Sequence, residues 1–174
     1  MPQNRRSYEK TRRIALSGLL FALAMALSFI EGTLTIPGLL PGMKLGLANI
    51  VTVFALYELG AVPALTILAA RCLLGGVFAG NLSALLFSLL GGFTAMLVMI
   101  GLKHCRRLSI YGVSIGGAAA HNIGQMAAAC ITLGNTMVLG YLPFLLAVSL
   151  ATGTLTGFVA GLLFRAMRNI HLSH

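Results

Sequence analysis

The charged residues of this chain are gathered in a few places, and this spacing limits what the chain can fold into. Ten of the twelve Lys and Arg residues lie at three points: Arg5, Arg6, Lys10, Arg12 and Arg13; Lys103, Arg106 and Arg107; Arg165 and Arg168. Crossing a bilayer core takes about 20 apolar residues per helix. The sequence offers six such runs, at roughly 14–31, 45–60, 62–80, 82–102, 111–134 and 138–164.

The apolar runs predict an all-α integral membrane protein. Of the residues, 58% are hydrophobic and only 9% charged, which leaves too little polar surface for a water-soluble globule. Backbone polar groups in lipid must be satisfied within each span, and continuous apolar runs favour helices over alternating barrel strands. We therefore expect a single domain over residues 1–174, in which a basic tail at 1–13 is followed by six transmembrane helices.

The basic segments also predict how the helices are oriented. Cationic segments stay on the cytoplasmic side of the membrane. Because the three basic places are separated by even numbers of spans, both termini are expected to be cytoplasmic. The net charge of +9 is then explained by topology and by contact with anionic lipid headgroups, so no nucleic-acid partner is expected.

The connection between the first two spans, residues 31–44, is predicted to lie outside the cell. Two Pro-Gly pairs disfavour continued helix there, and the segment is too apolar for an ordinary solvated loop. We expect it to fold back over the outer end of the bundle as a lid.

Arg71 is the most conspicuous polar residue, because it falls near the middle of the third span. An arginine at that depth needs an anionic or hydrogen-bonding partner inside the bundle. Glu31 and Glu58 are expected near opposite membrane faces, so neither is an evident mate. Binding a ligand, or bonding amides such as those of Asn49 and Gln125 as structural glue, are equally good interpretations.

Lys44 is the one basic residue predicted outside, where it either snorkels to headgroups or borders an anion-binding cavity. The group His121, Asn122 and Gln125 can be a proton relay, a ligand clamp or an interhelical cluster. No second His or Cys stands at metal-ligand spacing, so no metal is expected. The candidate substrate-binding residues are Lys44, Asn49, Arg71, Asn81, His121, Asn122 and Gln125.

Catalysis is disfavoured by the residue content. The chain has three glutamates and no aspartate, and it carries no Gly-rich phosphate loop and no nucleophile elbow. Nothing is available to hold the magnesium ions that diphosphate chemistry uses. We expect a protein that is not an enzyme and needs no cofactor.

Several of these elements together resemble a bacterial membrane family called heptaprenyl diphosphate synthase component I, or the Gx transporter family. The resemblance covers the chain from Arg12 to Arg165. It rests on Pro41-Gly42-Met43-Lys44-Leu45-Gly46-Leu47-Ala48-Asn49, on Arg71, on the Gly-rich stretch from Asn81 to Gly92, and on Ala118 to Gln125.

That family is in turn similar to the S components of energy-coupling factor (ECF) importers. The resemblance implies a six-helix subunit of the bacterial cell membrane that captures a micronutrient outside and works with a transmembrane T component and two cytoplasmic ATPases. In S components an Ala-x-x-x-Ala stretch of the first helix docks the T component, and Ala22 and Ala26 match it here.

Three hypotheses of function follow. The first is an S component that binds a small anionic or polar-headed micronutrient, such as a vitamin or a quinone or isoprenoid precursor. The second is a non-catalytic membrane subunit of a prenyl diphosphate synthase, since such synthases chelate magnesium with Asp-rich motifs and this chain has no aspartate. The third is a stand-alone proton-coupled transporter in which His121 titrates.

Overall fold

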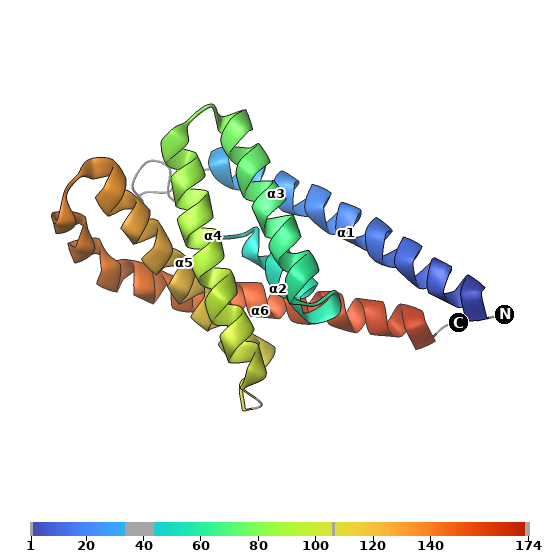
Figure 1. The fold of residues 1–174 in the computed structure, drawn as a ribbon. Coiled ribbons are helices and arrows are strands. Elements are labelled where there is room, and N and C mark those ends of the chain that lie inside the picture. Colours follow the sequence, from blue (N-terminus) through green and yellow to red (C-terminus); the bar gives the residue numbers. More distant parts are fainter. Residues whose placement is uncertain (1, 34–43, 106, 173–174) are drawn as a thin grey trace.

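The computed structural model describes residues 2–33, 44–105 and 107–172, and these residues contain helices and no strand (Figure 1). The all-α prediction is therefore confirmed for the described part of the chain. The elements are α1 (Pro2–Thr33), α2 (Asn49–Glu58), α3 (Ala61–Ala79), α4 (Leu82–His104), α5 (Ile110–Leu133), the 3-10 helix η1 (Thr136–Tyr141) and α6 (Leu142–Leu172).

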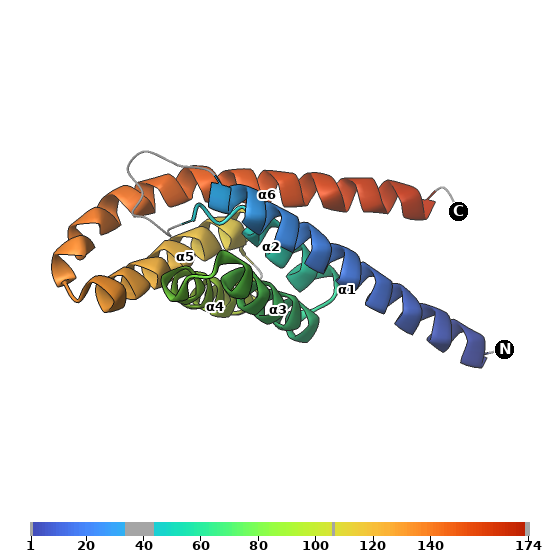
Figure 2. The same cartoon turned by 90° about the horizontal axis from the view of Figure 1, so that it is seen from above.

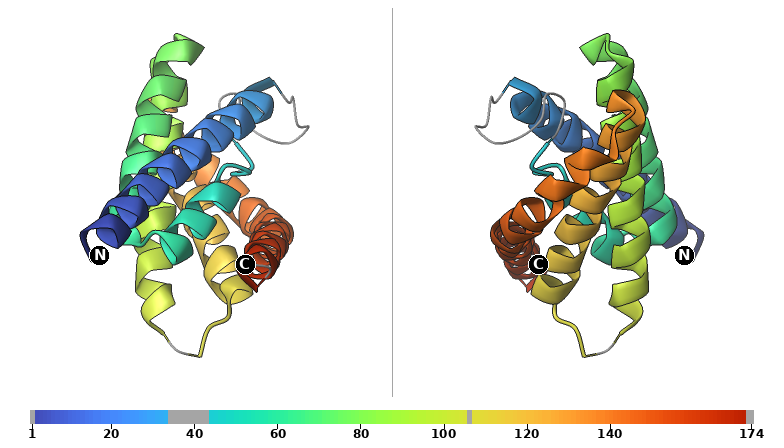
Figure 3. Two further views of the ribbon diagram at one scale, coloured as in Figure 1. Left: turned by 90° about the vertical axis from the view of Figure 1, so that its right-hand side faces the viewer. Right: turned by 90° about the vertical axis from the view of Figure 1, so that its left-hand side faces the viewer.

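The short helix α2 lies inside the bundle, surrounded by longer helices. Its residues Asn49–Leu56 are all buried, and it contacts α1, α3 and α6 (Figure 2). The hairpins α3–α4 and α5–α6 pack through the α4–α5 contact, and α1 crosses the outside of α2 and α3 (Figure 3). The start of α1 and the end of α6 lie at the same end of the molecule (Figure 1).

Glycines let the helices approach closely. A Cβ at Gly153 of α6 would lie 2.5 Å from the Ile115 Cα of α5, and one at Gly157 would lie 3.0 Å from the Tyr111 Cα. Such close approach of helix backbones is how small residues stabilise helix pairs in lipid, where burial of apolar surface gives no advantage.

Four helical segments are long and apolar enough to cross a membrane: Ser7–Thr33, Ala61–Ala79, Leu82–His104 and Thr136–Met167. Large apolar side chains on their surfaces are exposed, among them Phe29, Val77, Leu97 and Leu150. An apolar exterior over long helices is what lipid requires. These are the helices of a multi-pass membrane protein, while six spans and cytoplasmic termini remain predictions.

Three helix boundaries differ from those expected. The first helix begins at Pro2 rather than near residue 14, because proline suits a first helical position and the Lys, Arg and Glu of the tail favour helix. The second begins at Asn49 rather than near 45, and its ten residues rise only about 15 Å. The last run begins with 3-10 helix η1 before α6 starts at Leu142.

The delayed start of α2 has a local cause. Gly46 has a φ of +87°, a left-handed conformation that interrupts regular helix. The turn at residues 44–48 therefore leads into α2 without extending it. The predicted lid at 31–44 falls mostly on residues 34–43, which lie outside the described residues.

Candidate functional site

Buried polar side chains from five helices meet where the C-terminal end of α1 and the start of α2 reach the middle of the bundle. Polar groups are costly at such positions unless they bond to one another or to a ligand. We call this group the buried polar cluster. Its members are the buried Ser28 and Glu31 of α1, Asn49 of α2, Arg71 of α3, Ser88 of α4, and His121 and Gln125 of α5, together with the half-buried Lys44 before α2.

Glu31 anchors the turn that leads into α2. Its Oε1 accepts hydrogen bonds from the backbone N–H groups of Gly46 and Leu47, the latter at 3.2 Å. Glu31 is only 4% exposed, and its carboxylate is attracted to Lys44 and Arg71. The carboxylate thus joins α1 to the start of α2 and supplies the negative charge of the cluster.

Arg71 is held from one side only. Its Nη1 donates to Ser28 Oγ at 2.9 Å, while Nε and Nη2 have no partner among the described residues. A Cβ at Gly92 of α4 would lie 3.5 Å from Nη2, so the glycine leaves room beside the guanidinium. The unbonded Nε–Nη2 edge is the one that grips a carboxylate or phosphate with two parallel hydrogen bonds.

Lys44 links the turn before α2 to two other helices. Its Nζ donates to Ser88 Oγ at 3.2 Å, and its backbone N–H donates to Gln125 Oε1 at 3.3 Å. Burial lowers the pKa of Lys44 from its ordinary value of 10.5, and the nearby positive charge of Arg71 lowers it further. An anion placed between the two cations would favour the charged lysine.

His121 and Gln125 lie one turn apart on α5, with 3.0 Å between His121 Nε2 and Gln125 Nε2. Because Gln125 Oε1 accepts from the Lys44 N–H, its Nε2 is the donor and His121 Nε2 accepts. The imidazole is then neutral with its hydrogen on Nδ1, which faces the backbone of Gly91 in α4. Asn49 Oδ1 and Glu31 Oε2 have no hydrogen-bond partner among the described residues.

The structure brings together five of the seven candidate binding residues: Lys44, Asn49, Arg71, His121 and Gln125. The other two lie elsewhere. Asn81 is exposed and caps α4 by accepting from the Ser83 N–H at 2.9 Å, and Asn122 donates to the Leu145 carbonyl at 2.8 Å, which ties α5 to α6. Binding by any of the seven remains a prediction.

The sequence reasoning missed Ser28, Glu31 and Ser88. Glu31 was placed near the outer membrane face and away from Arg71, yet it belongs to the same cluster. The bonding partner of Arg71 is Ser28 rather than the amide of Asn49 or Gln125. The available signal was the spacing of Ser28 and Glu31, which at i and i+3 share one face of α1.

A family model described as heptaprenyl diphosphate synthase component I matches residues 20–163. This chain belongs to that family. The predicted resemblance is confirmed, and the matched range contains every member of the buried polar cluster. No match was found among curated proteins or among solved structures.

The two alanines of the predicted docking motif lie on the outside of α1 in this member of the heptaprenyl diphosphate synthase component I family. Ala22 and Ala26 are exposed, whereas Ala24 between them is fully buried. Gly18, one turn earlier, is also exposed and has no atom within 4 Å of an added Cβ. The face is open, and docking of a partner there remains a prediction.

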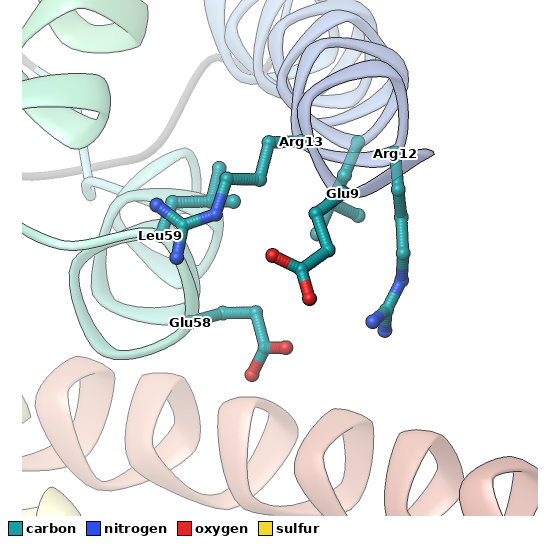
Figure 4. Close-up of a pocket in the computed structure, with 6 residues that line it drawn as sticks. Glu9, Arg12, Arg13, Glu58 and Leu59 are labelled. Carbon is teal, nitrogen blue, oxygen red and sulfur yellow. The ribbon is translucent and has the colours of Figure 1, made fainter. Parts of the chain in front are cut away.

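A second group of charged residues lies between the first part of α1 and the end of α2 (Figure 4). A pocket of about 270 Å³ is bordered by Glu9, Arg12 and Arg13 of α1 and by Glu58 and Leu59 at the end of α2. The carboxylates of Glu9 and Glu58 point into the same space. We call this group the exposed charged pocket, since its four charged side chains are all exposed.

Proposed function

We propose that this family member is the substrate-binding membrane subunit of an ECF-type importer and is not itself an enzyme. The observation that carries the proposal is the buried polar cluster. Among the described residues, it combines two guanidinium nitrogens of Arg71 that have no partner with acceptors on Glu31 and Asn49 that have none. Donors and acceptors left unbonded in a buried place are what a polar ligand needs for orientation.

The charges of the cluster support a small ligand with one negative charge. When Lys44 and Arg71 are charged and Glu31 is ionised, the cluster has one unbalanced positive charge. A carboxylate or a similar singly charged group would balance it and bond to the Nε–Nη2 edge of Arg71. A neighbouring O–H or N–H of the ligand would donate to Glu31 Oε2 or Asn49 Oδ1.

A second function is favoured by the family description, which names a synthase component. In that case the chain would be a non-catalytic membrane subunit of a prenyl diphosphate synthase. The buried cluster supports this alternative less well, because a diphosphate carries several negative charges and Glu31 would oppose it. Such a subunit would act as a membrane partner of the synthase and would not need to bind a ligand.

The two functions differ in the partners that they require. An importer subunit without a nucleotide-binding motif needs a T component and two ATPases, and the open face of Ala22 and Ala26 is the proposed docking surface. We expect these three partners to copurify with the tagged chain from membranes of its own host. Copurification of a prenyl synthase in their place would favour the alternative.

Two variants would test the docking surface. Replacing Ala22 and Ala26 together by Leu is expected to reduce recovery of the T component about tenfold, because the added side chains keep the helices apart. The control is Ala151→Leu, which introduces the same side chain at one exposed position of α6. Equal recovery with both proteins would remove the docking proposal.

A further inference from the structure

A groove of about 370 Å³ opens between the end of α2, the start of α5 and the C-terminal half of α6. It shares no residue with the buried polar cluster. Its walls are mostly aromatic or aliphatic, and a single basic residue stands at one end. The residues that matter here are Tyr57, Tyr111, Phe158, Gly161, Leu162 and Arg165.

The walls of this groove are held in place by contacts within the bundle. The Tyr57 ring lies edge-on to Phe164 with centroids 6.0 Å apart, and Lys103 Nζ lies 4.9 Å from the Tyr57 centroid. Gly161 leaves the floor open, since an added Cβ would lie 3.8 Å from the Tyr111 hydroxyl oxygen. Phe158 is 51% and Leu162 46% exposed, so an apolar surface faces the groove and the lipid beside it.

Arg165, the basic residue of this groove, has no acidic partner among the described residues. Arg165 is exposed and has no hydrogen bond or ion pair with another described residue. The whole chain has only three acids against twelve Lys and Arg, and two of the acids border the exposed charged pocket. The described acids are thus placed elsewhere, and the Arg165 guanidinium is available to an anion from outside the protein.

The position of Arg165 indicates which anion is within reach. It lies two residues before the end of the membrane-crossing segment Thr136–Met167, so its guanidinium is expected at headgroup level. The basic segments predict that this is the cytoplasmic face, which is rich in anionic lipids.

We propose that this groove is a binding site for one anionic phospholipid of the cytoplasmic leaflet. The lipid phosphate lies against the Arg165 guanidinium, whose planar fork bonds two phosphate oxygens. The Tyr111 hydroxyl is a second donor to the headgroup. One hydrocarbon chain lies along Phe158 and Leu162, where it replaces contacts with bulk lipid.

The test is native mass spectrometry of the full chain in detergent after its lipids have been removed. Equal amounts of phosphatidylglycerol and phosphatidylcholine are added, and complexes with one lipid are counted. We expect phosphatidylglycerol to be retained preferentially. One cation near an anionic headgroup corresponds to about a fivefold change in affinity, so Arg165→Ala should lower that retention about fivefold.

Two further variants separate a built site from general attraction. Gly161→Leu fills the groove without removing charge and should lower phosphatidylglycerol retention at least as much. Arg107→Ala removes one exposed cation of the basic 103–107 segment outside the groove and should leave retention unchanged. Equal retention of the two lipids, equal loss in Arg107→Ala and Arg165→Ala, or full retention in Gly161→Leu would each overturn the proposal.

Discussion

The buried polar cluster and the exposed charged pocket contain similar residues in opposite surroundings. One combines Glu31 with Lys44 and Arg71, and the other combines two glutamates with Arg12 and Arg13. In the cluster, burial strengthens each hydrogen bond, and defined atoms have no partner among the described residues. In the pocket, the charges are exposed to water and salt, where such interactions contribute little.

Charge alone therefore does not mark a binding site in this chain. What distinguishes the cluster is that its charged groups are fixed by partners from other helices, as Ser28 fixes Arg71 and the turn before α2 fixes Glu31. If this is correct, equivalent substitutions in the two regions should have very different effects.

The largest difference is expected for arginine. Arg71→Ala should lower the free energy of unfolding by about 4 kcal/mol, because it removes one of the two cations that face the buried Glu31 carboxylate and the donor to Ser28 Oγ. Arg13→Ala, in the exposed charged pocket, should change it by less than about 0.5 kcal/mol. Unfolding in mixed micelles with increasing denaturing detergent would measure both. Similar losses of stability in the two variants would show that burial does not distinguish the two regions.

The next largest effect is expected for the acids. Glu31→Ala removes the acceptor of the Gly46 and Leu47 N–H groups and should cost about 3 kcal/mol, since hydrogen bonds to charged groups are the stronger ones. Glu58→Ala serves as the exposed control and should be nearly neutral. The same unfolding measurement compares the two variants. An unchanged stability in Glu31→Ala would show that the turn is held by other contacts.

A smaller loss of stability is expected from crowding beside the cluster. A Cβ at Gly91 would lie 2.9 Å from both Gln125 Cγ and His121 Cε1, so Gly91→Ala should cost about 2 kcal/mol. Gly101 is on the same helix with nothing within 4 Å of an added Cβ. Gly101→Ala should therefore be neutral or slightly stabilising, and thermal unfolding of the pair would reveal any reversal of this order.

The smallest effect concerns the protonation of Lys44. Its pKa in the folded protein is below 10.5, so between the two values the unfolded chain binds more protons than the folded one. Raising the pH through that window should stabilise the folded protein, and this gain should vanish in Lys44→Met. Proton titration of ¹³C-methylated lysines by NMR measures the pKa directly. A Lys44 signal that titrates at or above 10.5 would contradict the burial of the ammonium group.

The helical class could be predicted because apolar runs leave few alternatives in lipid. The length of α2 could not, since its start depends on the left-handed Gly46 and on a carboxylate of another helix. A hydropathy pattern contains neither the backbone angle nor the long-range bond. The 3-10 helix η1 before α6 was missed for a similar reason, as it has the same apolar composition as the helix that follows.

The members of the cluster were only partly predictable. Arg71, His121 and Gln125 stand out because polar residues are rare inside apolar runs. The proximity of Glu31 to Arg71 was missed because Glu31 stands at the end of an apolar run. Its place in that run was taken as its depth in the membrane. Helix α1 crosses the bundle, which brings its C-terminal end against α2 and α3 (Figure 3).

The central claim is that the buried polar cluster binds a small, singly charged ligand, and gentle purification from the native host followed by native mass spectrometry tests it most directly. We predict that the wild-type protein retains such a molecule and that Arg71→Lys, which keeps the charge but loses the planar fork, retains at least tenfold less. A wild-type protein that retains no small molecule, or a variant that retains it equally well, would contradict the account.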